Sequence, residues 1–200
     1  MDVSHQKLTG PPSILDHDLQ QYFPELLKFE STREMEASEV WRKIRPEVVR
    51  ILDAVVVSEQ PAPVGRDLDD TERKENHPVG ETPPPLLRKE WSQERISALA
   101  WNIERGIQLD GIVEALKNHD RLKNKDLLLL TELDYGMARS GNRFVAKEIT
   151  DALGLNYAFA PVYIALQKGS GVESAMEGEN TAAIHGLAMF SLYPMTNIHA

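Results

Sequence analysis

Between residues 96 and 190, segments with the hydrophobic pattern of a strand alternate with segments that have the pattern of a helix. Ile96 to Ile103 alternates small and large residues and predicts a strand, and Leu127 to Leu130 is a continuous apolar run typical of a strand buried on both faces. Between these two runs, residues 109–116 repeat apolar side chains at helical spacing. This alternation of strand, helix and strand favours an α/β fold with polar side chains at the strand ends.

The alternation continues after the second strand. The pattern predicts a helix, a strand, a polar glycine-rich loop and two further strands, over residues 142–153, 157–166, 168–181, 184–190 and from 195 onward. Gly154 is a suitable stop for the helix, and residues 191–194 predict a turn. The loop is long enough to have a function of its own.

The first part of the chain has a helical pattern that gives way to the composition of a linker. Apolar residues recur at spacings of three or four from Leu19 to Val57, and Ser31 with Glu34 fits a capping box. Pro46 interrupts the pattern, so a kink or two consecutive helices are expected. The predicted organisation is a helical extension, a linker rich in proline and charge, and an α/β domain, over residues 1–57, 58–94 and 95–200.

Composition narrows the class of protein. The chain has 200 residues, of which 42% are hydrophobic and 26% charged, and a net charge of −9, so it lacks the basic character of a non-specific nucleic-acid binder. An acidic chain can still act on phosphate esters, because a bound cation bridges to the phosphate. The absence of cysteine excludes disulfides and thiolate metal sites. Neither a signal peptide nor a membrane span is recognisable, so a cytoplasmic location is expected.

Two polar residues at predicted strand ends are the main candidates for chemistry. Glu132 follows the second apolar run, where a carboxylate can bind a hard cation such as Mg²⁺; the alternative is a solvated carboxylate in a turn. Asn102 ends the first strand, where its amide could donate to a phosphate oxygen or hold a metal-bound water. The alternative for Asn102 is a turn-forming role, which the nearby Gly106 makes plausible.

The polar residues that follow Glu132 also have two possible roles, in phosphate binding or in the structure of the loop. Arg139 and Asn142 are candidates for contacts with a substrate phosphate, since guanidinium groups bind phosphate with two hydrogen bonds. The alternative pairs Arg139 and Arg143 with nearby acids and uses Ser140 or Asn142 as a helix cap. His185, before a glycine at the start of an apolar strand, is interpreted as a structural group. The motifs of zincins, P-loop proteins and serine hydrolases are absent from the sequence.

Three blocks of residues resemble the endonuclease/exonuclease/phosphatase superfamily, which has a DNase I-like fold. The blocks, in chain order, are Trp101-Asn102-Ile103-Glu104-Arg105-Gly106, Leu127-Leu128-Leu129-Leu130-Thr131-Glu132-Leu133-Asp134 and His185-Gly186-Leu187-Ala188-Met189-Phe190-Ser191-Leu192-Tyr193-Pro194-Met195. Each block is modest alone, and their order and spacing together carry the resemblance. The sequence departs from the family pattern at Thr131, Leu187 and Leu192, where many members have Gln, Asn and Arg.

The resemblance implies a fold and an activity. The fold is a DNase I-like two-sheet α/β sandwich with outer helices, and the activity is hydrolysis of phosphate esters with Mg²⁺, or Mn²⁺ in its place. Glu132 would be the principal metal ligand, and Asn102 would help to position the phosphate or the hydrated metal. A nuclease and a lipid, sugar or inositol phosphoesterase all fit the blocks, so the substrate is a phosphate ester and can include nucleic acid.

The remaining family motifs, which activate water and complete the site, follow the third block in the family. The matched part is about the first half of such a domain, so the catalytic set is incomplete within residues 1–200, and this chain is expected to be a fragment or a degenerate member, with little or no activity. The alternative function is a non-catalytic interaction protein whose helical region, residues 19–57, binds a protein partner.

Overall fold

The computed structural model describes residues 14–58 and 96–199, so nearly all of the expected linker at 58–94 lies outside the described residues. The five strands are β1 (Val56–Ser58), β2 (Ala98–Arg105), β3 (Leu127–Tyr135), β4 (Asn156–Ile164) and β5 (Ile184–Ser191). The α-helices are α1 (Phe23–Leu26), α2 (Thr32–Ala37), α3 (Glu39–Leu52), α4 (Leu109–Asn118) and α5 (Val145–Leu153). Short 3-10 helices are η1 (Leu19–Tyr22), η2 (Ala138–Ser140) and η3 (Gly171–Ala175).

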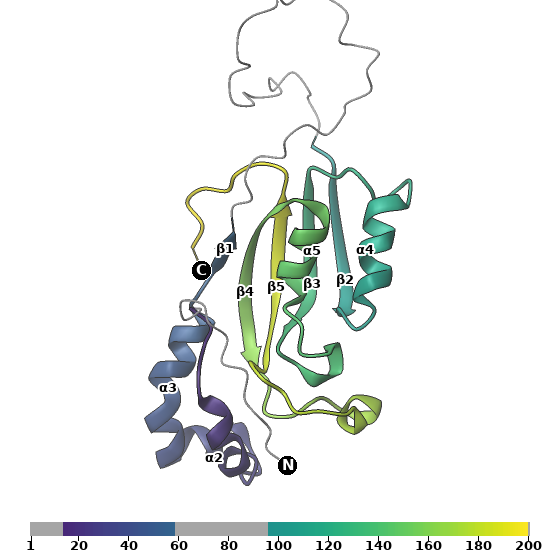
Figure 1. The fold of residues 1–200 in the computed structure, drawn as a ribbon. Coiled ribbons are helices and arrows are strands. Elements are labelled where there is room, and N and C mark those ends of the chain that lie inside the picture. Colours follow the sequence, from purple (N-terminus) through teal and green to yellow (C-terminus); the bar gives the residue numbers. More distant parts are fainter. Residues whose placement is uncertain (1–13, 59–95, 200) are drawn as a thin grey trace, which may run out of the picture.

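The strands form one mixed sheet in the order β1-β4-β5-β3-β2 (Figure 1). β2 and β3 are parallel and are connected through α4, whereas β5 is antiparallel to both of its neighbours, β3 and β4. The carboxyl ends of β2, β3 and β4 therefore lie at the same edge as the start of β5. The predicted mixed α/β class is confirmed, and every strand in the described part of the chain belongs to this sheet.

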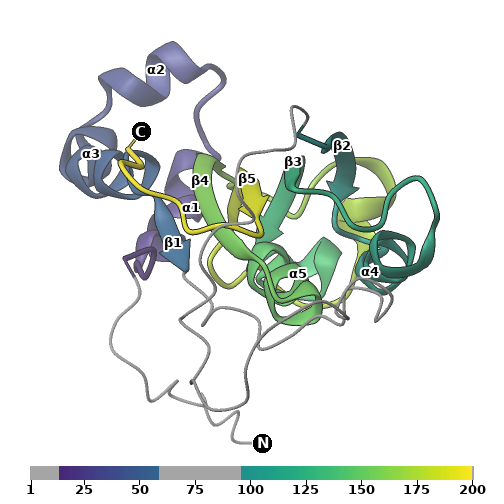
Figure 2. The ribbon, with the colours of Figure 1, turned by 90° about the horizontal axis from the view of Figure 1, so that it is seen from above.

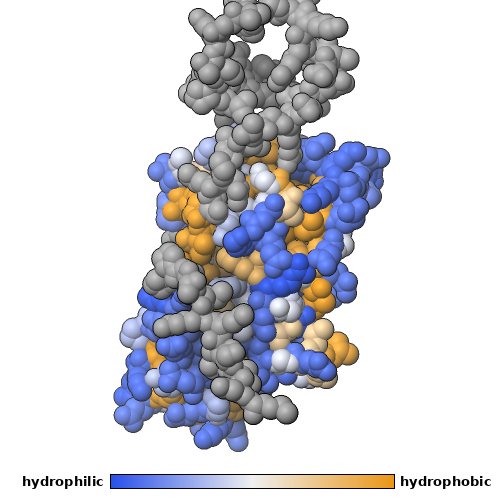
Figure 3. All heavy atoms as spheres, viewed as in Figure 1, coloured by the Kyte–Doolittle hydropathy of each residue, from blue (hydrophilic) through white to orange (hydrophobic). Residues whose placement is uncertain are grey.

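Helices α4 and α5 cover one face of the sheet (Figures 1 and 2). Both have the apolar stripe that the sequence predicts, and Gly154 ends α5 in a left-handed conformation with φ 64°. Seen from this side, the surface is largely hydrophilic with separate hydrophobic areas (Figure 3). Beneath the helices, Leu128 and Leu130 of β3 are 3% and 1% exposed.

The opposite face of the sheet exposes apolar side chains. Leu129 is 43% exposed and Leu187, on the neighbouring β5, is 45% exposed. The prediction that the run from Leu127 to Leu130 is buried on both faces is therefore wrong. The side chains alternate between the two faces as in any strand, and helices cover only one of them. We call this second surface the open face.

The N-terminal residues contribute both helices and a strand. Ser31 accepts a hydrogen bond from the Glu34 amide as the capping box predicts. A division into two helices at Pro46 is wrong, because Pro46 lies inside the single helix α3. The predicted helical pattern is wrong beyond Leu52, because Val56–Ser58 pairs with β4 as an edge strand. Valines favour strands when a partner strand is available, and β4 supplies that partner.

After β5 the chain is irregular. The strand that the sequence predicts from Met195 is wrong, since residues 192–199 contain no regular strand. Within the described residues, none of the helices has the length and apolar character needed to cross a membrane.

Candidate functional site

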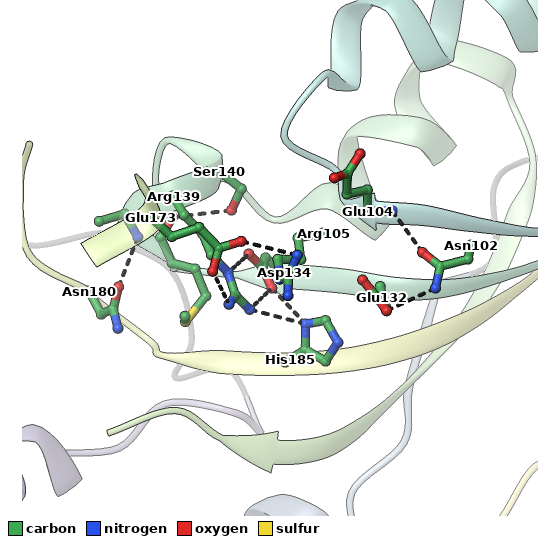
Figure 4. Close-up of polar contacts among 12 residues, drawn as sticks. Asn102, Glu104, Arg105, Glu132, Asp134, Arg139, Ser140, Glu173, Asn180 and His185 are labelled. Atoms are coloured by element: carbon green, nitrogen blue, oxygen red, sulfur yellow. Dashed lines mark hydrogen bonds and ion pairs between the residues drawn. The ribbon is translucent and has the colours of Figure 1, made fainter. Parts of the chain in front are cut away.

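Two neighbouring parallel strands bring Asn102 and Glu132 together. The Asn102 Nδ2 group donates a hydrogen bond of 2.8 Å to Glu132 Oε1, although 30 residues separate the two in sequence (Figure 4). Strand pairing places Asn102 opposite Thr131, on the open face of the sheet. The structure therefore unites the two main candidates of the sequence in one polar site.

The backbone at Glu132 forms a bulge. The register of β3 shifts between Thr131 and Leu133 against both β2 and β5, and Glu132 has φ 59°. The expectation that Glu132 lies directly after its strand is corrected, because β3 continues to Tyr135. A bulge turns a side chain away from the regular alternation, and a non-glycine residue in the left-handed region is strained. Such strain is common at functional sites.

Asn102 has a second hydrogen bond that holds its own side chain. Its Oδ1 atom accepts from the Glu104 amide at 2.9 Å, which is the local bond of a turn-forming asparagine. The expectation that Asn102 ends its strand is wrong, because β2 continues to Arg105. The local bond to Glu104 is compatible with the contact to Glu132. The local bond fixes the amide so that its nitrogen faces the carboxylate.

A buried ionic cluster lies beside this pair on the same edge of the sheet (Figure 4). Arg139 donates to both oxygens of Asp134, at 2.8 and 2.9 Å, and His185 Nδ1 lies 2.7 Å from Asp134 Oδ1. The Asp134 side chain is fully buried. Burial disfavours its charged form, but hydrogen bonds from Arg139 and His185 outweigh this effect and lower the pKa of the carboxyl group.

The two candidate phosphate contacts have partners within the chain. Arg139 is 5% exposed and bound to Asp134, and Asn142 bonds the Glu179 carbonyl and the Thr181 amide. Arg143 pairs with Glu148 and Asp110. The part of the alternative in which these arginines pair with nearby acids is therefore confirmed. The helix cap at Ser140 or Asn142 is wrong, because α5 has Phe144 at its N-cap and no side-chain cap hydrogen bond. His185 is buried and has its own partner, Asp134.

Glu173 also belongs to the cluster, and the sequence analysis does not identify it. Its carboxylate lies 3.0 Å from Arg105 Nη1 and 3.4 Å from Arg139 Nη1. Glu173 comes from η3, in the long loop between β4 and β5, so only the folded structure shows its position. The pairing of Asp134 with His185 is likewise a result of the β3–β5 register.

The open carboxylate of Glu132 fits a weakly coordinated Mg²⁺. Asn102 occupies Oε1, and the described residues place no other hydrogen bond on this carboxylate. No group of three or more His, Cys, Asp and Glu side chains in the described parts forms a metal cage. Mg²⁺ needs no such cage, because it takes one or two carboxylates together with water and phosphate oxygens. Glu104 points away from Glu132 (Figure 4).

Comparisons with models of protein families, with curated proteins and with solved structures find no match to this chain.

Proposed function

We propose that this chain contributes to Mg²⁺-dependent hydrolysis of phosphate esters, through a site in which Glu132 binds the metal and Asn102 positions it or the phosphate. The observation that carries the proposal is the 2.8 Å hydrogen bond between these two side chains. A second observation supports it: the three blocks that resemble the endonuclease/exonuclease/phosphatase superfamily form the adjacent strands β2, β3 and β5. The DNase I-like sandwich is part of the same proposal.

The side chains of Glu132 and Asn102 have different roles in this proposal. Glu132 supplies a carboxylate oxygen, and the bulge in β3 holds it at the open face. Asn102 orients that carboxylate and has an N–H group that can donate to a phosphate oxygen. When bound, Mg²⁺ neutralises the charge that develops on the phosphate oxygens as water attacks in line. The buried cluster around Asp134 fixes the end of β3.

The matched blocks fit several substrate classes. Nucleic acids and lipid, sugar or inositol phosphates share the phosphate ester on which Glu132 and Asn102 would act. The net charge of −9 favours substrates that approach together with a cation.

Metal binding is the direct test of the proposal. Titration with Mn²⁺, followed by electron paramagnetic resonance, is expected to show a site that weakens at least about tenfold in Glu132→Gln. Glu132→Gln keeps the shape of the side chain and removes its charge. A matched control is Glu177→Gln, an exposed glutamate in the loop after η3, which is expected to bind Mn²⁺ as the natural chain does. Equal binding by Glu132→Gln and the natural chain would show that Glu132 is not the ligand.

Hydrolysis provides the second measurement. With Mg²⁺ and an aryl phosphodiester substrate, any turnover by this chain is expected to disappear in Glu132→Gln and to fall about a hundredfold in Asn102→Ala, as for removal of one preorganised donor. Turnover that survives Glu132→Gln would contradict the proposed role.

The alternative function, protein binding by residues 19–57, would need a surface other than the apolar stripe that suggested it. That stripe packs inside the chain: Leu19, Phe23, Leu26, Val40, Ile44 and Ile51 are all buried. No observation in the described residues favours this second function over the first.

A further inference from the structure

The Glu173 carboxylate lies between two arginine side chains and balances their charge as a bound anion would. Arg105 follows Asn102 at the end of β2, and Arg139 lies in η2, just after β3. Both guanidinium groups reach the Glu173 carboxylate, at 3.0 Å from Arg105 and 3.4 Å from Arg139. The carboxylate therefore bridges the ends of the two strands that carry the candidate site (Figure 4).

The charges of the cluster require an anion at this position. Asp134 neutralises Arg139 through two hydrogen bonds, at 2.8 and 2.9 Å. Arg105 has no such second acid: its ion pair in the described residues is with Glu173, and its buried Nε atom has no hydrogen-bond partner there. Removal of the Glu173 carboxylate would leave a half-buried positive charge without compensation, which is costly.

The short helix η3 turns only Glu173 inward, since its other four residues are exposed. The neighbouring Val172 is 87% exposed, whereas Glu173 itself is 9% exposed. Gly169 has φ 141°, and a Cβ atom at this position would overlap Glu173 Oε2. The carboxylate can therefore enter the cluster only because residue 169 is a glycine.

We propose that Arg105 and Arg139 form an anion subsite for a phosphate group, and that Glu173 fills this subsite from within the chain. The ligand class is a phosphate monoester group, which has more negative charge and more acceptor oxygens than a carboxylate and therefore competes well for two guanidinium groups. The ligand would displace Glu173 together with η3.

The link to a substrate rests on the proposed function. If the site at Asn102 and Glu132 acts on one phosphate ester, the subsite would bind a second phosphate of the same molecule, and would favour substrates that carry more than one phosphate. Anion binding itself does not depend on metal or turnover, so it is measured with EDTA present. A chain that binds no phosphate at this subsite can still bind Mn²⁺ at Glu132, and a chain that binds no Mn²⁺ can still bind phosphate. The two proposals can therefore fail separately.

The test is isothermal titration of inorganic phosphate into the full chain. Glu173→Ala is expected to bind phosphate at least about tenfold more tightly than the natural chain, since a charge-assisted hydrogen bond is worth that much. Gly169→Ala is expected to show the same gain by steric displacement of the carboxylate, and it serves if Glu173→Ala does not fold. Glu177→Ala, an exposed acid in the same loop, is the matched control and should give no gain.

Two results would overturn the proposal. One is phosphate binding by Glu173→Ala and Gly169→Ala no tighter than that of the natural chain. The other is a gain that persists after Arg105→Ala is added to either variant, which would place the phosphate elsewhere. The gain is expected to disappear in both double variants and to weaken with added salt.

Discussion

The backbone of Glu132 has a φ of 59°, in a region where a side chain with a Cβ atom is strained. Glycine relieves this strain, whereas alanine keeps it. We expect Glu132→Gly to be more stable than Glu132→Ala by about 1 kcal/mol in urea unfolding. Both variants lose the hydrogen bond from Asn102, so the comparison isolates the backbone. An alanine variant that equals the glycine variant would show that the bulge is not strained.

His17 is expected to make stability depend on pH. Burial, the largest effect, lowers its pKa below 6.5, and its Nδ1 atom accepts from the Leu19 amide while Nε2 lies 2.7 Å from the Ala182 carbonyl. These bonds require neutral imidazole with hydrogen on Nε2. His17 therefore takes up a proton at a higher pH in the unfolded chain than in the folded chain. The free energy of unfolding falls as the pH drops below the pKa of an unfolded histidine.

The measurement is urea unfolding of the natural chain and His17→Gln at about pH 7.5 and about pH 5.5, which bracket the pKa of an unfolded histidine. The natural chain is expected to lose more stability on acidification than the variant. A direct check is titration of His17 by nuclear magnetic resonance. Equal losses in the two chains would assign the acid sensitivity to other groups.

At the scale of elements, the two faces of β3 give a matched pair of leucines. Leu130 is 1% exposed beneath the helices, and its neighbour Leu129 is 43% exposed on the open face. We expect Leu130→Ala to lower the free energy of unfolding by about 2–5 kcal/mol, the range for a buried leucine. Leu129→Ala should cost less than about 1 kcal/mol, since little apolar area leaves water there. Comparable losses in urea unfolding would mean that the open face is covered.

The sequence predicts elements better than it predicts their faces. Four leucines in a row at 127–130 identify a strand, but such a run hides the alternation that separates a covered face from an open one. Strand β1 is missed because Val56 and Val57 continue a helical spacing, and their strand conformation depends on pairing with the distant β4.

The candidate site, like the fold, is predictable from the sequence only in part. Asn102 and Glu132 are predictable, because each is a polar residue next to an apolar strand, and parallel strands bring their carboxyl ends together. The bulge at Glu132 and the contact of Asp134 with His185 depend on the register of β3 against β5. Glu173 lies in a loop, and nothing in its sequence neighbourhood indicates that it reaches Arg105.

At the scale of the whole molecule, the N-terminal residues and the sheet share their contacts. β1 pairs with β4 over three residues, α3 packs against β4, and His17 contacts the carbonyl of Ala182, just before β5. Leu15 and Ile51 are fully buried in the same hydrophobic core as the sheet residues. A helical region that only preceded an independent domain would share none of these contacts.

Two tryptophans allow this unity to be tested by unfolding. Two variants are needed, each with a single tryptophan and phenylalanine at the other two tryptophan positions. The variant that keeps Trp41 reports on α3, and the variant that keeps Trp101 reports on β2. If the two parts form one cooperative unit, both fluorescence signals change at the same urea concentration, as two-state unfolding requires. We expect Ile51→Ala, which removes a buried side chain from α3, to shift both midpoints downward together. Separate midpoints, or a shift in the Trp41 signal alone, would show that the N-terminal helices unfold independently and that β1 does not bind them firmly to the sheet.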